Sequence, residues 1–336
     1  MIIGIVKETI AQETRVGLTP QSAEKLIKSG FEIMIEQNAG LKACFRNAEY
    51  TAMGVKVAAS REEVLKNSDI WLTVNTPEAK DIRLLKNKSL VIGNLQNHKL
   101  NKSFSYMQAH NINCLALNRV PRLSKAQSFD ILSSQNNLSG YQAVFKAAQF
   151  LPSTLPLMIT SAGTLAPAKI LVIGIGVAGL QAIATAKRLG AKVYAYDINS
   201  QLKEQAESVG AKFVEDFKPI LGEVSVIITA VAPANTMAPK IITSEILEML
   251  PNKTVLIDLA AAQGGNIENS ANLKVTRCQN CIIYGDGALA REIPHAASIL
   301  LANNFSNFLL YIYDAENKQI KLDKNDEIID AIWLRE

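Results

Sequence analysis

The chain has 336 residues, of which 48% are hydrophobic and 20% are charged, and its 35 basic and 31 acidic residues leave a formal net charge of +4. This length predicts two domains, and the two signs of charge are interspersed, which excludes the basic stripe of a nucleic-acid-binding protein. Prolines or glycines interrupt the longest uncharged runs, and Lys7 and Glu8 interrupt the N-terminus, so neither a membrane span nor a signal peptide is expected. The chain is therefore expected to be cytoplasmic.

Strand and helix signals alternate through the first third of the chain. Residues 1–6 are apolar and predict a strand, and Thr19 followed by Pro20 predicts the start of a helix that Gly30 ends. Further strands are expected at residues 31–35, 69–74, 90–94 and 114–117, and further helices around residues 62–66, 80–85 and 104–110. Such an alternation is typical of a complete α/β unit.

Three segments of different character follow this unit. Residues 122–130 (RLSKAQSFD) are polar, and residues 131–150 predict a long helix suited to connecting two domains. Residues 151–168 are rich in Pro, Ser and Thr and lead into the next strand.

The strongest motif in the sequence is a glycine turn between a strand and a helix. Residues 170–173 form a short apolar run, and Gly174, Gly176 and Gly179 then give G-x-G-x-x-G before a helical pattern at residues 180–189. The first glycine permits a tight turn, the second lets the backbone approach a pyrophosphate, and the third lets the helix pack against the strand. The pattern therefore predicts a dinucleotide-binding turn, with the phosphates at the helix N-terminus.

An acidic residue stands at the end of the following strand. Asp197 comes directly after the predicted strand at residues 193–196 and lies 23 residues after Gly174. A carboxylate at this position binds the ribose hydroxyls of NAD and repels the 2′-phosphate of NADP. The site is therefore predicted to bind NAD(H) rather than NADP(H).

The alternation continues to the end of the chain. Helices are expected at residues 201–208 and 244–250, and strands at residues 224–230, 254–259, 273–276 and 282–284. A helix over residues 295–310 is expected to return to the first domain, and the tail is expected to form short strands joined by polar turns.

The predicted fold class is α/β, with two Rossmann-like domains built on parallel sheets, the first discontinuous in sequence. The expected N-terminal domain comprises residues 1–132 with residues 302–336. The expected nucleotide-binding domain comprises residues 133–301 and includes the connecting helix.

Cys278 and Cys281 form a C-x-x-C pair, while Cys44 and Cys114 stand alone. A zinc site would need further Cys or His ligands at suitable spacing, and none is near the pair, so no metal site is expected. A thioredoxin-like role would need the pair at the start of a helix, whereas here it lies between two strand-like segments. Reduced thiols in a turn are the preferred interpretation, and the role of the pair stays open.

Five segments resemble one superfamily. They are GIVKE (residues 4–8), ETRVGLTP (13–20), GVAGLQAIATAKRLGAKVYAYD (176–197), APKIIT (238–243) and IDLAAAQGGN (257–266). These segments are similar to the alanine dehydrogenase and nicotinamide nucleotide transhydrogenase superfamily, and the similarity covers nearly the whole chain.

A sixth segment distinguishes the two branches of that superfamily. PRLSKAQSFDILSSQ (residues 121–135) closely resembles the segment that proton-translocating transhydrogenases place beside the nicotinamide. The resemblance implies four working residues, Arg122, Gln127, Asp130 and Ser133. It places Gln127 between the two nicotinamide nucleotides and the other three on the NAD(H) side. Direct hydride transfer needs no general acid or base, but it needs two rings held at near-attack distance.

The same resemblance implies a cofactor and partners. Val177, Asp197 and Ile198 are expected along the adenosine, and Val231 is expected near the bound nucleotide. The chain is expected to be the soluble NAD(H)-binding α subunit of a proton-translocating transhydrogenase, an enzyme active only with its partner subunits. NADP(H) would be bound by a partner subunit, and membrane-embedded subunits would supply the proton channel. The chain would form a homodimer held at the cytoplasmic face of the inner membrane through those partners.

An amino-acid dehydrogenase is the first alternative. Arg15 matches the substrate-binding arginine of alanine dehydrogenases, but their Lys, His and Asp fall on Asn75, Asn94 and Ala262. Asn and Ala cannot transfer the proton that amine oxidation requires, although a shifted alignment would bring His98 to the position of the histidine.

A non-catalytic NAD(H)-binding paralogue is the second alternative. Transhydrogenases carry a mobile loop, with a Tyr that closes over the nucleotide, before the strand at residues 224–230. Only residues 214–223 stand in that position here. Residues 232–240 (APANTMAPK) also lack the glycine of the usual I-P-G-K-P-A-P-K segment. Closure over the nucleotide is therefore not expected to follow the family pattern.

Overall fold

The computed structural model describes residues 1–233, 236–278 and 280–334, and it divides into two compact units. Unit 1 comprises Met1–Gln135 and Ile293–Glu336, and unit 2 comprises Asn136–Glu292. Two residues of the APANTMAPK segment, one residue of the C-x-x-C segment and the last two residues of the tail lie outside the described residues.

The chain returns to unit 1 at Ile293, earlier than residue 302, where the sequence led us to expect the return. Helix α11 (Pro294–Ile312) packs along its length against unit 1, on α1 (Pro20–Lys28) and on the 3₁₀ helix η4 (Ser124–Phe129). Because these contacts begin at the first turns of the helix, all of α11 belongs to unit 1.

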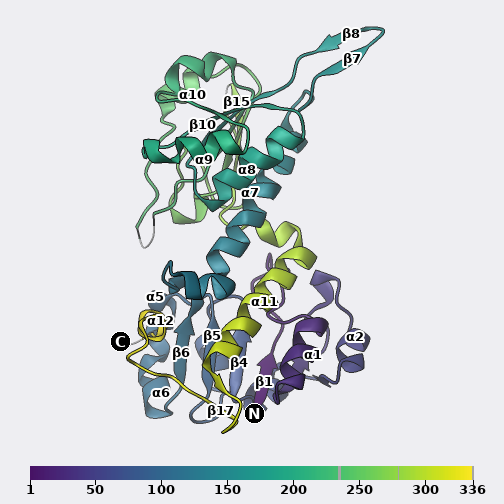
Figure 1. The fold of residues 1–336 in the computed structure, drawn as a ribbon, viewed down its shortest axis with the longest axis vertical. Helices are drawn as coiled ribbons and strands as arrows, with labels where there is room; N and C mark the ends of the chain where they lie inside the picture. The colour runs from purple at the N-terminus through teal and green to yellow at the C-terminus, as the bar shows by residue number, and fades with distance from the viewer. Residues whose placement is uncertain (234–235, 279, 335–336) are drawn as a thin grey trace. The chain divides into compact units, whose positions relative to one another are not determined.

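Unit 1 is built on a six-stranded parallel sheet with the strand order β3-β2-β1-β4-β5-β6 (Figure 1). The strands are β1 (Ile2–Ile5), β2 (Glu32–Glu36), β3 (Lys56–Ala58), β4 (Ile70–Thr73), β5 (Leu90–Gly93) and β6 (Asn113–Ala116). Strands β4 and β5 are buried at every position, as expected for parallel strands covered on both faces. The order reverses between β1 and β4, and in such sheets ligands bind at the carboxyl ends of the strands beside this switch point.

The helices of unit 1 cover both faces of this sheet. They are α1, α2 (Asn47–Ala52), α3 (Arg61–Asn67), α4 (Ala79–Ile82), α5 (Asn97–Leu100), α6 (Phe104–Ala109), α11 and α12 (Glu327–Ile332). The predicted start of α1 is confirmed, because the Thr19 hydroxyl accepts the N–H of Ser22 at 3.3 Å and Pro20 occupies the first turn.

The tail differs from the expected run of short strands. A two-stranded ribbon, β16 (Tyr313–Asp314) with β17 (Gln319–Ile320), is present, but the chain then forms helix α12. Asp326 caps this helix, since its Oδ1 accepts the N–H of Ile328 at 2.8 Å. Ile328, Ile329 and Ile332 are buried, and this helical spacing of apolar residues was missed.

Unit 2 is built on a seven-stranded sheet with the order β11-β10-β9-β12-β13-β15-β14. The strands are β9 (Lys169–Ile173), β10 (Lys192–Tyr196), β11 (Lys212–Phe213), β12 (Val226–Thr229), β13 (Thr254–Asp258), β14 (Lys274–Arg277) and β15 (Cys281–Gly285). All pairs are parallel except β14 with β15. The prediction of two Rossmann-like domains with parallel sheets is therefore confirmed.

Helices cover this second sheet as well. Within unit 2 lie most of α7 (Ile131–Phe150), α8 (Val177–Arg188), α9 (Lys203–Ser208) and α10 (Ser244–Met249). Helices α7 and α8 pack so closely at Gly140 that a Cβ on this residue would lie 2.0 Å from the carbonyl oxygen of Ala178. None of the described helices combines the length and the apolar character that crossing a bilayer requires.

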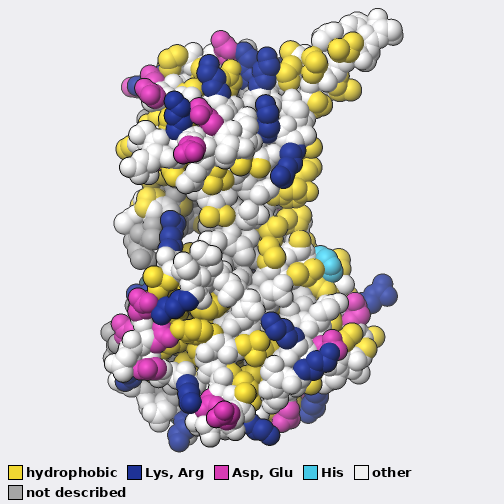
Figure 2. Space-filling model, in the orientation of Figure 1, with side chains coloured by type: hydrophobic (Ala, Val, Ile, Leu, Met, Phe, Trp, Pro, Cys, Tyr) yellow, Lys and Arg dark blue, Asp and Glu magenta, His cyan; other side chains and the backbone are white. Residues whose placement is uncertain are grey.

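A two-stranded hairpin projects from unit 2 (Figure 1). Its strands are β7 (Met158–Thr160) and β8 (Gly163–Leu165), each too short to stand out in the Pro-, Ser- and Thr-rich sequence. Every position of both strands is exposed, and Ile159 is 74% exposed. Figure 2 shows hydrophobic side chains on this hairpin.

Candidate functional site

The glycine turn of unit 2 has the three properties expected from its sequence. Gly174 has φ +94°, and a Cβ there would lie 2.8 Å from Cγ2 of Val231. A Cβ on Gly179 would lie 1.8 Å from the carbonyl oxygen of Gly174, so helix α8 packs at this distance only without a side chain. Apart from its neighbours in the chain, the described residues place no heavy atom within 4 Å of the position that a Cβ on Gly176 would take. Gly176 is the N-cap of α8, so there is room for a phosphate at the N-terminus of this helix.

Asp197 follows β10 and is tied to the glycine turn. Its Oδ2 accepts the N–H of Ile175 at 2.7 Å, and its Oδ1 accepts the N–H of Asn199 at 2.9 Å. Each carboxylate oxygen has two acceptor sites, so both oxygens can still accept a ribose hydroxyl. Ile198, directly after it, is 94% exposed, and Val177 at the start of α8 is 39% exposed.

The loop after β12 is held by an asparagine that the sequence did not single out. Asn266 is fully buried and bonds both backbone groups of Val231. The N–H of Val231 donates to Oδ1 at 3.1 Å, and Nδ2 donates to the Val231 carbonyl at 2.8 Å. The Lys240 ammonium donates to the carbonyls of Gly264 and Ile267 at 2.7 and 3.0 Å. Two loops at the carboxyl edge of the sheet are thus fixed to each other beside the glycine turn.

The polar segment that resembles the transhydrogenase signature forms η4 and the start of α7 in unit 1. Asp130 caps α7, since its Oδ1 accepts the N–H of Ser133 at 2.9 Å and its Oδ2 accepts the Ser133 hydroxyl at 2.5 Å. Arg122 and Gln127 are exposed, whereas Asp130 and Ser133 are half-buried. The structure therefore brings Asp130 and Ser133 together and leaves Gln127 and Arg122 accessible to a ligand.

Helix α11 anchors this segment. The side-chain amides of Asn304 and Asn307 both donate to the Ser128 carbonyl, at 2.9 and 3.1 Å. The rings of Phe129 and Phe308 pack edge to face with their centroids 5.5 Å apart. Asparagines three residues apart on a largely apolar helix were the sequence signal for this anchor, because they share one face.

The switch point between β1 and β4 is filled by side chains of unit 1 itself. The Glu8 carboxylate accepts the N–H of Val74 at 2.7 Å and the amide of Asn75 at 3.0 Å. The same Asn75 nitrogen donates to the Glu13 carboxylate at 3.0 Å. The place where an open α/β sheet ordinarily receives a ligand therefore holds the half-buried Glu8 carboxylate and the buried Glu13 carboxylate, bridged by one amide.

Arg15 completes this cluster. Its guanidinium pairs with both oxygens of the Glu13 carboxylate, at 2.8 and 2.7 Å, and it donates to Oε1 of Gln135 at 2.9 Å. Gln135 in turn donates to the carbonyl of Ala297 at 3.1 Å, which links the cluster to α11. The arginine that corresponds to the substrate-binding arginine of alanine dehydrogenases is thus engaged within the protein.

The two carboxylates of the cluster have opposite pKa shifts. Burial raises the pKa of Glu8, and its hydrogen bonds to Asn75 and Val74 offset only part of this effect. Burial would also raise the pKa of Glu13, but the hydrogen bond and charge of Arg15 and the amide of Asn75 outweigh it and lower the pKa to about 2.

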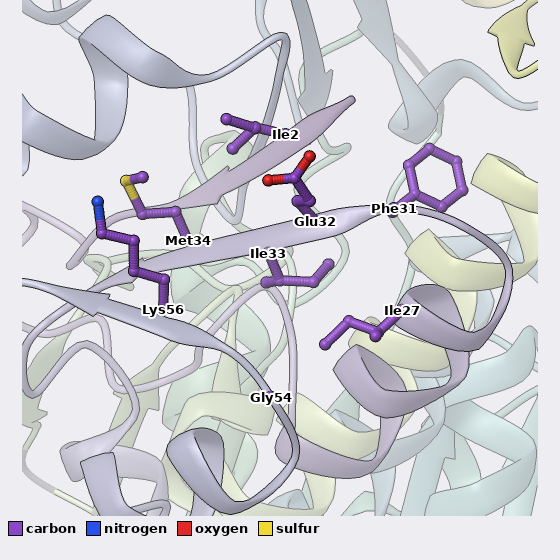
Figure 3. Close-up of a pocket in the computed structure, with 8 residues that line it drawn as sticks. All are labelled: Ile2, Ile27, Phe31, Glu32, Ile33, Met34, Gly54 and Lys56. Carbon is purple, nitrogen blue, oxygen red and sulfur yellow. The ribbon is translucent and has the colours of Figure 1, made fainter.

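A small hollow of about 170 Å³ lies on the same sheet, away from this cluster (Figure 3). Ile2 and Glu32 are the first residues of β1 and β2, so the hollow lies at the amino ends of these strands. Ligands of such sheets bind at the opposite, carboxyl ends. The hollow is also smaller than ligand pockets, which usually reach about 300 Å³ or more. The full lining is Ile2, Ile27, Phe31, Glu32, Ile33, Met34, Gly54 and Lys56. We assign no function to it.

Two family models together match nearly the whole chain. The model described as Alanine dehydrogenase/PNT, N-terminal domain, matches residues 4–139, and the model described as Alanine dehydrogenase/PNT, C-terminal domain, matches residues 143–334. The chain belongs to the alanine dehydrogenase/PNT family. The superfamily resemblance inferred from the sequence is confirmed.

Relatives within the alanine dehydrogenase/PNT family favour its transhydrogenase branch. The NAD(P) transhydrogenase subunit alpha of Haemophilus influenzae is 36% identical over 365 residues, covering 99% of this chain and 70% of the relative. The first part of NAD(P) transhydrogenase subunit alpha from Rickettsia prowazekii is 35% identical, covering 98% of this chain and 93% of the relative. The crystal structure of transhydrogenase from Sinorhizobium meliloti matches with a TM-score of 0.93 and 37% identity, over 99% of this chain and 98% of that chain.

The connection between β11 and β12 is short, as the sequence indicated. Strand β11 ends at Phe213, and the 3₁₀ helix η6 (Lys218–Glu223) leads directly into β12. Leu221 and Phe217 are buried, so this connection packs against the rest of unit 2.

Proposed function

We propose that this chain is the NAD(H)-binding α subunit of a proton-translocating transhydrogenase. Hydride passes directly from NADH bound here to NADP⁺ bound on a partner subunit, giving NAD⁺ and NADPH. The similarity to relatives named NAD(P) transhydrogenase subunit alpha supports this proposal.

Unit 2 supplies the dinucleotide site in this proposal. The pyrophosphate lies against Gly176 and the N-terminus of α8, where a helix offers N–H groups and a positive dipole end. Asp197 accepts the hydroxyls of the adenosine ribose, and its charge disfavours the 2′-phosphate of NADP(H). Val177 and Ile198 lie along the adenosine, and Val231 borders the nucleotide.

Unit 1 supplies the groups that position the nicotinamide for transfer. The observation that carries this assignment is the exposed Gln127 beside the hydrogen-bonded Asp130 and Ser133. Gln127 contacts both nicotinamides through its amide, and Arg122, Asp130 and Ser133 hold the NAD(H) side. These groups bind and orient, which is all that direct hydride transfer requires of the protein.

A single substitution tests the transfer role. Gln127→Asn shortens the side chain by one methylene and keeps the amide, so NADH affinity should change little while hydride transfer to a partner-bound NADP analogue slows about 100-fold. Gln108→Asn on α6 is the matched control, because Gln108 is also exposed but lies at the amino side of β6. Equal transfer rates in the two variants would sink the role of Gln127.

The proposal includes a homodimer and membrane-embedded partners. The exposed apolar hairpin β7–β8 supports self-association, because a solvated hairpin of this composition gains stability by covering Leu157, Ile159 and Leu165. Ile159→Asp should yield monomers in light scattering, whereas Met249→Asp, at another exposed apolar position, should not. Partner subunits then hold the dimer at the cytoplasmic face of the inner membrane and supply the NADP(H) site and the proton channel.

A non-catalytic NAD(H)-binding paralogue is the second candidate, and the short connection between β11 and β12 favours it. Calorimetric titration with NADH, followed by addition of a transhydrogenase NADP-binding subunit, separates the two. Binding with partner-dependent transfer supports the subunit, and binding without transfer supports the paralogue. Binding of neither nucleotide contradicts both.

A further inference from the structure

The C-x-x-C pair closes the β14–β15 hairpin at one end of the sheet of unit 2. Arg277 and Ile282 are the last paired residues of the two strands, and Cys278 and Cys281 come next along the two strands in the same register. The N–H of Cys278 donates to the Cys281 carbonyl at 2.9 Å. The two cysteines therefore face each other across an antiparallel ladder, where Cα atoms are about 5.5 Å apart, within the range that a disulfide spans.

Both thiols are free. Neither cysteine forms a disulfide with another residue, and the backbone hydrogen bond between them places their side chains on adjacent strands at the same turn. A third His, Cys, Asp or Glu that could complete a metal site with them is not found among the described residues. Two free cysteines at opposite sides of one turn, with no further ligand among the described residues, suit oxidation to a disulfide better than metal binding.

The environments of the two sulfurs differ. Cys281 is 3% exposed and belongs to the apolar cluster that includes Ile242, Ile267 and Ile283, whereas Cys278 is half-buried at the edge of this cluster. Burial, together with the neighbouring Cys278, raises the pKa of the Cys281 thiol to about 12. An oxidant arriving from solvent therefore meets Cys278 first, and Cys281 stays protonated behind it.

We propose that Cys278 and Cys281 form a reversible redox pair that a peroxide oxidises to an intramolecular disulfide. The Cys278 thiolate attacks one oxygen of hydrogen peroxide, the O–O bond breaks, and a sulfenic acid and hydroxide result. The Cys281 sulfur then attacks the Cys278 sulfur, the S–O bond breaks, and water leaves with the Cys281 proton. Two thiols lose two electrons to one peroxide, which becomes two waters, and a small dithiol reverses the reaction.

The disulfide would fasten an edge strand. In the described structure β14 pairs with β15 alone, and the Leu273 N–H donates to the Gly285 carbonyl at the far end of the hairpin. Asn272, just before it, accepts the N–H of Gly287 through its side chain at 3.1 Å. Oxidation should therefore slow the hydrogen exchange of the β14 amides nearest the turn, because the disulfide adds a covalent link between the two strands at that end.

The test is thiol mapping of the full chain after titration with hydrogen peroxide. Peptide mass spectrometry without reductant should find Cys278 linked to Cys281, with loss of those two thiols and their full return after dithiothreitol. Cys44 and Cys114 are internal controls, since Cys44 is exposed without a partner thiol and Cys114 is buried. Cys281→Ser should halt the reaction at a Cys278 sulfenic acid that dimedone traps.

Two results would overturn the proposal. The first is that peroxide oxidises Cys44 while Cys278 and Cys281 both still react fully with an alkylating reagent once the treated chain is unfolded. The second is that both sulfurs oxidise without a linked peptide. The wild-type mapping decides the matter even where the Cys281→Ser variant fails to fold.

Discussion

The buried ion pair of Glu13 and Arg15 is expected to contribute to the free energy of unfolding of unit 1. Their side chains are only 4% and 9% exposed, and the guanidinium binds both carboxylate oxygens. Glu13→Gln keeps the shape of the side chain but removes the negative charge that the Arg15 guanidinium binds. Removing one partner of a buried ion pair costs about 3–5 kcal/mol at neutral pH.

The pH dependence of this contribution follows from the pKa of Glu13. The carboxyl has a pKa of about 2 in the folded chain and about 4.5 in the unfolded chain, so its contribution is present above pH 4.5 and is lost as the pH falls towards 2. The difference corresponds to about 3 kcal/mol in total, of which about 1 kcal/mol is lost between pH 5 and pH 3.5.

Urea unfolding followed by tryptophan fluorescence measures this loss. The sequence has two tryptophans, Trp71 and Trp333, and both lie in unit 1, so the signal reports the unfolding of the unit that holds Glu13. Wild-type protein should lose about 1 kcal/mol more than Glu13→Gln over this pH interval. Identical slopes for the two proteins would refute the reasoning.

Glu8→Gln is the matched control, because Glu8 lies in the same cluster with the opposite shift. Its pKa is raised on folding, so its contribution to stability is greatest below its unfolded pKa and falls as the pH rises through its folded pKa. Glu8→Gln should therefore change the pH profile in the opposite direction to Glu13→Gln. A change of the same sign would show that the cluster responds to general acid unfolding.

Three further substitutions test the nucleotide site. Asp197→Asn should weaken NADH binding about tenfold and narrow the preference over NADPH, and an unchanged ratio of the two affinities would contradict the ribose assignment. Gly179→Ala should destabilise unit 2 by about 3 kcal/mol and abolish NADH binding, whereas Gly222→Ala, where a Cβ meets no atom within 4 Å, should do neither. Asn266→Leu should cost about 2 kcal/mol and weaken NADH binding, because it leaves both backbone groups of Val231 without their partner, and normal calorimetric affinity would argue against a positioning role.

Much of the fold was predictable from the sequence because its signals are local. The G-x-G-x-x-G turn and the acid after the next strand are set by residues within one strand–helix–strand unit, and their geometry depends on chain conformation over a few residues. The same holds for the cap at Thr19. Helix α12 and the β7–β8 hairpin were missed, since a short element gives few repeats of its pattern. The roles of Arg122, Gln127, Asp130 and Ser133 stay predictions.

The sequence by itself determined the two α/β domains, the glycine turn with Asp197, and membership of the alanine dehydrogenase/PNT superfamily through its motifs. Only the tertiary structure decided how these elements are held. Arg15 meets Gln135 across 120 residues, Ser128 meets Asn304 across 176, and Asn266 meets Val231 across 35. The physical reason is that a hydrogen bond depends on the positions of two atoms in space. When the packing of sheets and helices sets that distance, no spacing along the chain reveals it.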